Sequence, residues 1–258
     1  GAFVLCYLIF LVILGLPVMT MEFAVGRASQ KSPVKAYQAL EKPGQKWHIH
    51  GYITVIGCYL LMMFYTTVSG WMLHYFYLTA TGKFTGLDAD QVGGVFNEML
   101  SQPLVMAFWM IVVVAIGIFV CSRGLQNGLE KITKVMMIAL LAIMVVLAIN
   151  SIMMDGAAEG LKFYLIPDFE RMKELGIGYT IVAAMNQAFF TLSLGIGAMA
   201  IFGSYIGKER SLLGESANIA ILDTFVAIMA GLIIFPACFS YNVEVNAGPS
   251  LIFITLPN

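Results

Sequence analysis

The sequence predicts an all-α, polytopic membrane protein with about six transmembrane helices. Of its 258 residues, 60% are hydrophobic and only 11% are charged, whereas a soluble domain carries about 25% charged residues. The charged residues leave six long gaps, and each gap is long enough to hold the roughly 20 apolar residues that cross a bilayer. This composition excludes an ordinary cytosolic enzyme, a nucleic-acid-binding protein and a disordered chain.

Each predicted span is a gap between charged residues. In chain order the gaps are 1–21, 47–82, 99–122, 135–154, 176–207 and 216–243, the last of which contains Asp223. The first gap is not a signal peptide, because it begins without a basic flank and no A-x-A cleavage pattern follows it.

The basic residues gather in alternate loops. Ten of the 14 Lys and Arg residues follow the first, third and fifth predicted spans. By the positive-inside rule these loops are cytoplasmic. The sequence therefore predicts a multi-pass protein of the cell inner (plasma) membrane with the Gly1 and Asn258 ends on the extracellular side. Because a chain that enters the membrane from outside at its first residue lacks an insertion signal, we expect a fragment whose preceding helix is missing, with further helices beyond its C-terminal end.

The sequence does not show the motifs of a metal centre or an ATPase. The four cysteines have no C-x-x-C spacing and the three histidines form no H-x-x-x-H or H-E-x-x-H pattern, so neither a zinc site nor a disulfide framework is predicted. There is no P-loop, which argues against ATP-driven transport within this chain. No nucleophile and base are paired by a motif, and we do not expect an enzyme.

Asp223 is the only ionisable residue well inside a predicted span. An ionisable group at bilayer depth costs about 2.5–3.5 kcal/mol on insertion scales and usually marks a functional site. Two interpretations remain open at this point: a ligand for a cation or proton, or a protonated packing residue hydrogen-bonded to another helix.

Gly195 and Gly197 interrupt the fifth predicted span near its middle, and Gln187 and Thr191 share a polar helical face just before them. A break at this depth frees backbone groups, which persist only where they are buried in protein or line a cavity. In secondary transporters such broken helices bind the ion and the charged groups of the substrate. Close helix packing through small residues is the alternative.

Tyr65 lies near the middle of the second predicted span, on one helical face with Leu61, Val68 and Met72. Its hydroxyl group needs a partner in a dry interior. A ligand can be that partner, and so can a neighbouring backbone carbonyl.

Three motifs resemble the neurotransmitter:sodium symporter family, and its bacterial amino-acid transporter branch most of all. Residues 15–27 (GLPVMTMEFAVGR) are similar to the end of the family's second helix, residues 123–131 (RGLQNGLEK) to the loop before its fifth, and residues 190–197 (FTLSLGIG) to the unwound centre of its sixth. The resemblance implies part of an inverted-repeat transporter fold with a broken sixth helix, of which this chain would be a fragment covering helices two to seven.

The resemblance also implies how this single transmembrane domain is divided. Residues 1–154 would be helices two to five of the first inverted repeat, and residues 155–178 an extracellular loop. Residues 179–240 would be helices six and seven of the second repeat, followed by the start of another extracellular loop at 241–258.

Site residues follow from the same resemblance. Tyr65 is similar to the tyrosine that binds the substrate carboxylate, and Phe190 to the aromatic lid over the substrate. Thr191 matches a residue at the sodium ion that touches that carboxylate, and Asp223 stands where the family usually has an Asn ligand to the same sodium. The remaining pocket positions are Leu61, Ser193, Gly195 and Ile196.

Chloride-dependent relatives bind the anion at positions that Tyr7, Gln187 and Thr191 match, whereas Asp223 and Ala227 stand where those relatives have Asn and Ser. A fixed carboxylate at this place can supply the negative charge that chloride supplies elsewhere. The hypothesis is that chloride is not required.

The leading interpretation is a sodium-coupled symporter that carries a neutral, hydrophobic amino acid by alternating access. Its expected partners are Na⁺, the amino-acid substrate, the lipid bilayer and the remaining helices of the same transporter, with no nucleic acid. The alternative is a non-transporting or degenerate membrane protein of the same fold that acts as a structural or regulatory subunit.

Overall fold

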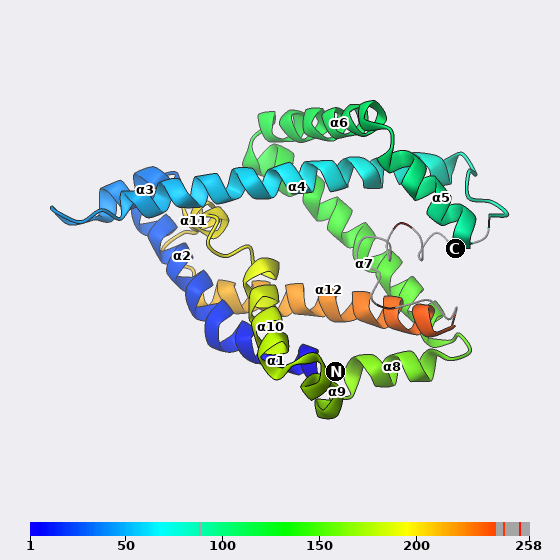
Figure 1. Ribbon diagram of the computed structural model, residues 1–258. Coiled ribbons are helices and arrows are strands. Elements are labelled where there is room, and N and C mark those ends of the chain that lie inside the picture. The colour runs from blue at the N-terminus through cyan, green and yellow to red at the C-terminus, as the bar shows by residue number, and fades with distance from the viewer. Residues whose placement is uncertain (88, 241–244, 246–252, 254–258) are drawn as a thin grey trace. The chain divides into compact units, whose positions relative to one another are not determined.

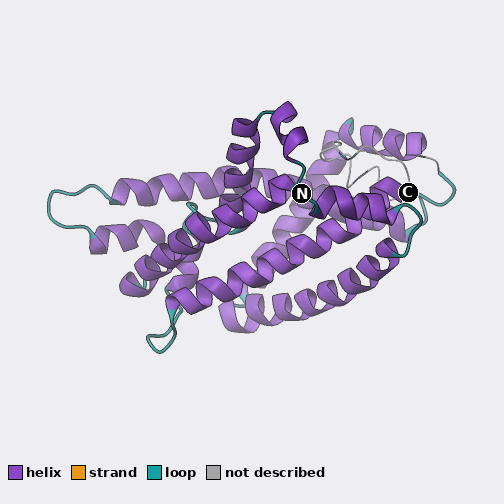
Figure 2. Ribbon diagram, turned by 90° about the horizontal axis from the view of Figure 1, so that it is seen from below, coloured by secondary structure: helices purple, strands orange, loops and turns teal. Residues whose placement is uncertain are grey.

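The computed structural model describes residues 1–87, 89–240, 245 and 253, and every regular element within them is helical (Figure 1). Figure 2, which is coloured by secondary structure, shows only helices and connecting loops over this part of the chain. The prediction of an all-α protein is confirmed. Apart from Val245 and Phe253, the expected loop 241–258 lies outside the described residues, as does the end of the last predicted span.

The chain divides into two compact units, each made of two segments. The first comprises Gly1–Leu60 and Ala158–Ile233, and the second comprises Leu61–Ala157 and Ile234–Asn258. Two long helices, α4 (His48–Ala80) and α12 (Leu212–Ser240), contribute residues to both units.

The remaining elements of the first unit are short and medium-length helices. They are α1 (Ala2–Phe10), the π-helical turn η1 (Leu11–Gly15), α2 (Leu16–Ser29), α3 (Pro33–Leu40), α8 (Ala157–Leu165), α9 (Phe169–Leu175), α10 (Ile177–Thr191) and α11 (Ala198–Gly203). The second unit contains α5 (Ala89–Leu100), α6 (Pro103–Ser122), the π-helical turn η2 (Leu125–Glu130) and α7 (Lys131–Ile152).

Within the described part of the chain, five helical stretches are long and apolar enough to cross a membrane, and each overlaps a predicted span. They are Ala2–Ser29, His48–Ala80, Pro103–Ser122, Gly128–Ile152 and Leu212–Ser240. The first is continuous although η1 widens one of its turns. That turn directly precedes Pro17, which has no N–H to donate to the carbonyl four residues earlier. The remaining predicted span, 176–207, is divided between α10 and α11, neither of which is long enough to cross alone.

Two glycines allow α2 and α11 to pack with their backbones in contact. A Cβ atom at Gly203 would lie 2.6 Å from the carbonyl oxygen of Phe23, and one at Gly26 would overlap the carbonyl group of Ala200. Beside this crossing the side chains of Met19 and Phe23 are fully buried. They belong to the core of the first unit, which also contains Tyr7, Leu11, Ala184, Ala188, Leu192, Leu194, Leu212 and Ala220.

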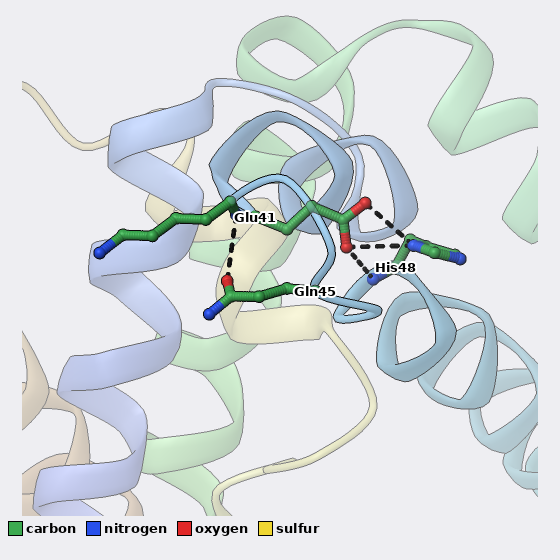
Figure 3. A network of polar contacts seen from close by, with 4 residues as sticks. Glu41, Gln45 and His48 are labelled. Atoms are coloured by element: carbon green, nitrogen blue, oxygen red, sulfur yellow. Dashed lines mark hydrogen bonds and ion pairs between the residues drawn. The ribbon is translucent and has the colours of Figure 1, made fainter.

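The loop before α4 is held by a small polar network (Figure 3). Glu41 Oε2 accepts a hydrogen bond from the backbone N–H of His48 at 3.0 Å, Oε1 lies 2.9 Å from the His48 ring, and Gln45 accepts one from the N–H of Lys42. The hydrogen bond from the His48 N–H lowers the pKa of Glu41, and the His48 ring adds to this. The polar network is therefore formed at neutral pH, and it weakens only as the pH falls through the lowered pKa of Glu41.

The crossing of α2 and α11 gives a stability prediction. Gly203→Ala places a methyl group against the Phe23 backbone, and overpacking of this kind costs about 1–3 kcal/mol. We expect the melting temperature of the purified complete protein to fall by several degrees in a thermal unfolding measurement in detergent. The control is Gly178→Ala in α10, where a Cβ atom would meet nothing within 4 Å; its melting temperature should be unchanged or slightly higher. Equal melting temperatures for the two variants would contradict the close approach.

Candidate functional site

The centre of the site is a break between two helices. α10 ends at Thr191 and α11 begins at Ala198, and in between Ser193, Gly195 and Gly197 have φ angles of 51°, 82° and 74°. This left-handed backbone cannot continue an α-helix, and it favours glycine. At Gly197 a side chain is also excluded by space, because a Cβ atom would lie 2.8 Å from the Pro33 ring. The predicted interruption of this span is confirmed.

Glu22 of α2 binds the exposed backbone of the break. Its Oε1 atom accepts a hydrogen bond of 2.7 Å from the N–H of Gly195. Its second oxygen, Oε2, is buried and has no hydrogen-bond partner among the described residues. The carboxylate thus fixes the break from one side and keeps one oxygen available for a further donor.

Asp223 is not the only ionisable residue inside a helical span, and the prediction from the sequence was wrong on this point. α2 continues to Ser29, so Glu22 lies within the apolar helical stretch Ala2–Ser29. A span that is defined as a gap between charged residues ends at the first charged residue. A charged residue inside a longer helix is therefore missed. The signal that could have found Glu22 is its place in the 15–27 motif, between the apolar residues Met21 and Phe23.

Two further titratable residues lie near Glu22. The rings of Tyr37 in α3 and His50 in α4 pack edge to face with their centroids 4.9 Å apart. Burial raises the pKa of the Tyr37 hydroxyl, and the negative charge of Glu22 raises it further. Tyr37 is therefore a neutral hydrogen-bond donor at physiological pH.

A second group of polar side chains lies at the end of α10. The Thr191 hydroxyl donates a hydrogen bond of 2.7 Å to Asp223 Oδ2 of α12. The Tyr7 hydroxyl lies close to Thr191, Asp223 and Thr224. The hydroxyls of Tyr7 and Thr224 are buried, and neither makes a hydrogen bond of good geometry within the described residues. We call Tyr7, Thr191, Asp223 and Thr224 the polar cluster.

The polar cluster has the chemistry of a cation site. Hard cations bind carboxylate and hydroxyl oxygens, and the cluster offers one carboxylate and three hydroxyl groups. Buried hydroxyls without a partner cost about 1–3 kcal/mol each, so they indicate a position where an ion or water belongs. The described residues contain no group of three or more His, Cys, Asp or Glu that could bind a transition metal.

The structure brings some of the predicted site residues together. Thr191, Asp223 and Tyr7 meet in the polar cluster. Gln187 lies one helical turn before Thr191 on α10, Phe190 lies directly beside it, and Ser193, Gly195 and Ile196 lie in the break. Leu61 and Tyr65 belong to the second unit, and their part in a shared site stays a prediction. Glu22 and Thr224 were not among the predicted site residues.

The sequence matches the description "Sodium:neurotransmitter symporter family" over residues 1–98 and 89–258. The chain belongs to this family. Symporters of this family are sodium-coupled transporters and not enzymes, which agrees with the absence of a catalytic motif. The resemblance seen in the three sequence motifs is thereby confirmed.

Individual relatives of the symporter family agree with this assignment. The "Uncharacterized sodium-dependent transporter YhdH" of Bacillus subtilis is 37% identical over 257 residues, which cover 100% of this chain and 56% of YhdH. The sodium-dependent neutral amino acid transporter B(0)AT2 of Rattus norvegicus is 23% identical over 91% of the chain. The crystal structure of MhsT in complex with L-phenylalanine superposes with a TM-score of 0.91 at 37% identity, covering 100% of this chain and 57% of MhsT. The chain thus spans just over half the length of YhdH and of MhsT.

The contact between Glu22 and the break can be tested by hydrogen exchange. Glu22→Ala removes a hydrogen bond to a charged group, worth about 1.5–3 kcal/mol, so the amides of residues 193–198 should exchange at least about tenfold faster in the complete protein. Glu22→Gln keeps an oxygen acceptor and should give an intermediate increase. Glu209→Ala, which removes an exposed carboxylate elsewhere in the first unit, is the control and should leave the break unchanged. Unaltered exchange in the Glu22→Ala protein would remove Glu22 from this role.

Proposed function

We propose that this chain is part of a sodium-coupled symporter for a neutral, hydrophobic amino acid that works by alternating access. The observation that carries the proposal is the hydrogen-bonded pair Thr191 and Asp223 at the end of a broken helix, in a chain that matches the symporter family along its length. The alternative, a non-transporting protein of the same fold, needs neither an intact polar cluster nor the break between α10 and α11.

Sodium is bound in this proposal by Thr191 and Asp223. The carboxylate supplies the negative charge, and the C-terminal end of α10 adds the partial negative charge of its last carbonyl groups. In broken helices of secondary transporters, such helix ends coordinate the coupling ion. Because the surroundings are poorly hydrated, the attraction between the carboxylate and the ion is stronger than it would be in water.

The proposed substrate pocket combines a polar end and an apolar end. Tyr65 would hold the carboxylate of the amino acid next to the sodium ion, close to Thr191 and the break at Ser193 and Gly195. Leu61, Phe190 and Ile196 would surround the side chain. None of these positions offers an acid or base for a charged substrate side chain. L-phenylalanine, which is bound in the structure of MhsT, is a substrate of the type that such a pocket would take.

The orientation in the membrane is part of the same proposal. The loops rich in Lys and Arg would face the cytoplasm, so the segment 155–178 with α8 and α9 would face the outside of the cell inner (plasma) membrane. One bundle of helices would rock against a scaffold and expose the site to one side at a time.

We also propose that transport does not require chloride. Position 227 is an alanine and has no hydroxyl group to bind an anion, whereas Asp223 places a fixed carboxylate in the polar cluster beside Tyr7 and Thr191. Gln187 follows the same face of α10 one turn away. A carboxylate at this place makes a second, mobile anion unnecessary for balancing the sodium charge.

Substrate binding gives the first test. Labelled phenylalanine should bind the purified complete protein in sodium buffer and not in potassium buffer. Tyr65→Phe removes a hydrogen bond to a charged carboxylate, so its dissociation constant should rise about tenfold or more. Tyr59→Phe is the matched control, because Tyr59 lies on another face of the same helix. Equal binding in both salts would contradict sodium coupling, and unchanged binding in Tyr65→Phe would remove Tyr65 from the pocket.

Replacing chloride by gluconate tests the anion proposal. In proteoliposomes containing the complete protein, sodium-driven uptake should keep its rate in gluconate, because Asp223 carries the required charge. Asp223→Asn should abolish uptake in gluconate. A large loss of rate in the unmodified protein when chloride is withdrawn would show that chloride is needed.

A further inference from the structure

Tyr164 of α8 is a buried tyrosine that packs on α12, although its helix belongs to the connecting segment 155–178. Only 8% of its surface is exposed. Its hydroxyl lies 3.5 Å from the carbonyl oxygen of Ala227, at the outer limit of a hydrogen bond. Its ring occupies the space beside Gly231, where any Cβ atom would overlap the ring. The missing side chain at Gly231 is therefore what allows Tyr164 to lie against α12.

The contact lies at the edge of the polar cluster. Ala227 follows Asp223 by four residues, one turn of α12, so the two share a helical face. Burial raises the pKa of the Tyr164 hydroxyl, and the neighbouring Tyr7 raises it further. Tyr164 is therefore neutral at physiological pH and lies close to a member of the cluster. Its ring covers α12 next to the turn that carries the ion-binding carboxylate.

α8 itself is fixed to the following helix. The guanidinium group of Arg171 in α9 lies over the ring of Phe163, 4.9 Å from its centroid, and Phe163 directly precedes Tyr164. This contact joins α8 to α9 beside Tyr164.

We propose that Tyr164 is a positioning residue that closes the polar cluster on the side of α8 and thereby strengthens sodium binding at Asp223. The inference rests on the proposed function and adds a residue to it. By covering the turn from Ala227 to Gly231, which follows the turn that carries Asp223, the ring keeps water from the carboxylate, and a lower local dielectric strengthens the attraction between the carboxylate and the ion. The segment 155–178 is then coupled to ion occupancy, because any movement of α8 away from α12 weakens the sodium site.

Sodium titrations on the complete protein test this role. The quantity measured is the sodium concentration at half-maximal binding of labelled phenylalanine. We expect it to rise about twofold to threefold in Tyr164→Phe, which loses a weak hydrogen bond, and about tenfold in Tyr164→Ala, which opens the cluster to water. Tyr179→Ala, at an exposed tyrosine of α10, is the control and should leave the value unchanged. The melting temperature without sodium is recorded in parallel.

A second pair of variants separates the contact from general destabilisation. Gly231→Ala should raise the half-saturating sodium concentration because its methyl group displaces the Tyr164 ring. Once the ring has been removed by Tyr164→Ala, the methyl group has room, so the double variant should resemble Tyr164→Ala alone. Independent, additive effects would overturn the proposal, as would a lowered melting temperature with unchanged sodium dependence. If the unmodified protein shows no sodium dependence, the proposed function itself fails, and this inference fails with it.

Discussion

The fold of the first unit depends on one requirement, which is that every backbone group of a helix broken inside the membrane must find a partner. The break at 192–197 turns the N–H of Gly195 toward α2, and Glu22 accepts its hydrogen bond. Glu22 can reach it only because Gly26 and Gly203 bring the backbones of α2 and α11 into contact. The close helix crossing and the polar break therefore support each other.

The same break determines where the residues of the polar cluster lie. Because α10 ends at Thr191, the last helical side chain meets α12 at Asp223, while the left-handed residues after it turn the chain away toward α11. The buried hydroxyls of Tyr7 and Thr224 come from α1 and α12 and complete the polar cluster. Four side chains from three helical segments converge because α10 stops where it does.

The sequence predicted those features that depend on local chemistry. Gaps between charged residues located the spans, and Gly195 and Gly197 located the break, because chain hydrophobicity and glycine's tolerance of positive φ act through neighbouring residues. Thr191 and Asp223 entered through the family resemblance. The contacts of Glu22 with Gly195 and of Tyr164 with Ala227 join residues 173 and 63 positions apart, and no periodicity connects such pairs. Tyr164 lies in a segment whose charged residues predicted only a loop, so its contact with α12 was not predicted.

The hydrogen bond between Thr191 and Asp223 is compatible with a bound cation and helps to prepare its site. A hydroxyl group has one proton to donate and two lone pairs to offer. With its proton directed to Asp223 Oδ2, the Thr191 hydroxyl keeps its lone pairs available to a cation, as does the second carboxylate oxygen. The protons of Tyr7 and Thr224 can turn toward the carboxylate and leave their lone pairs to the ion. In the proposed site, a sodium ion entering this space would meet oxygen atoms that folding has already brought together, and it need not break the Thr191–Asp223 bond. The energetic cost of arranging the ligands would then be met by folding and not by binding.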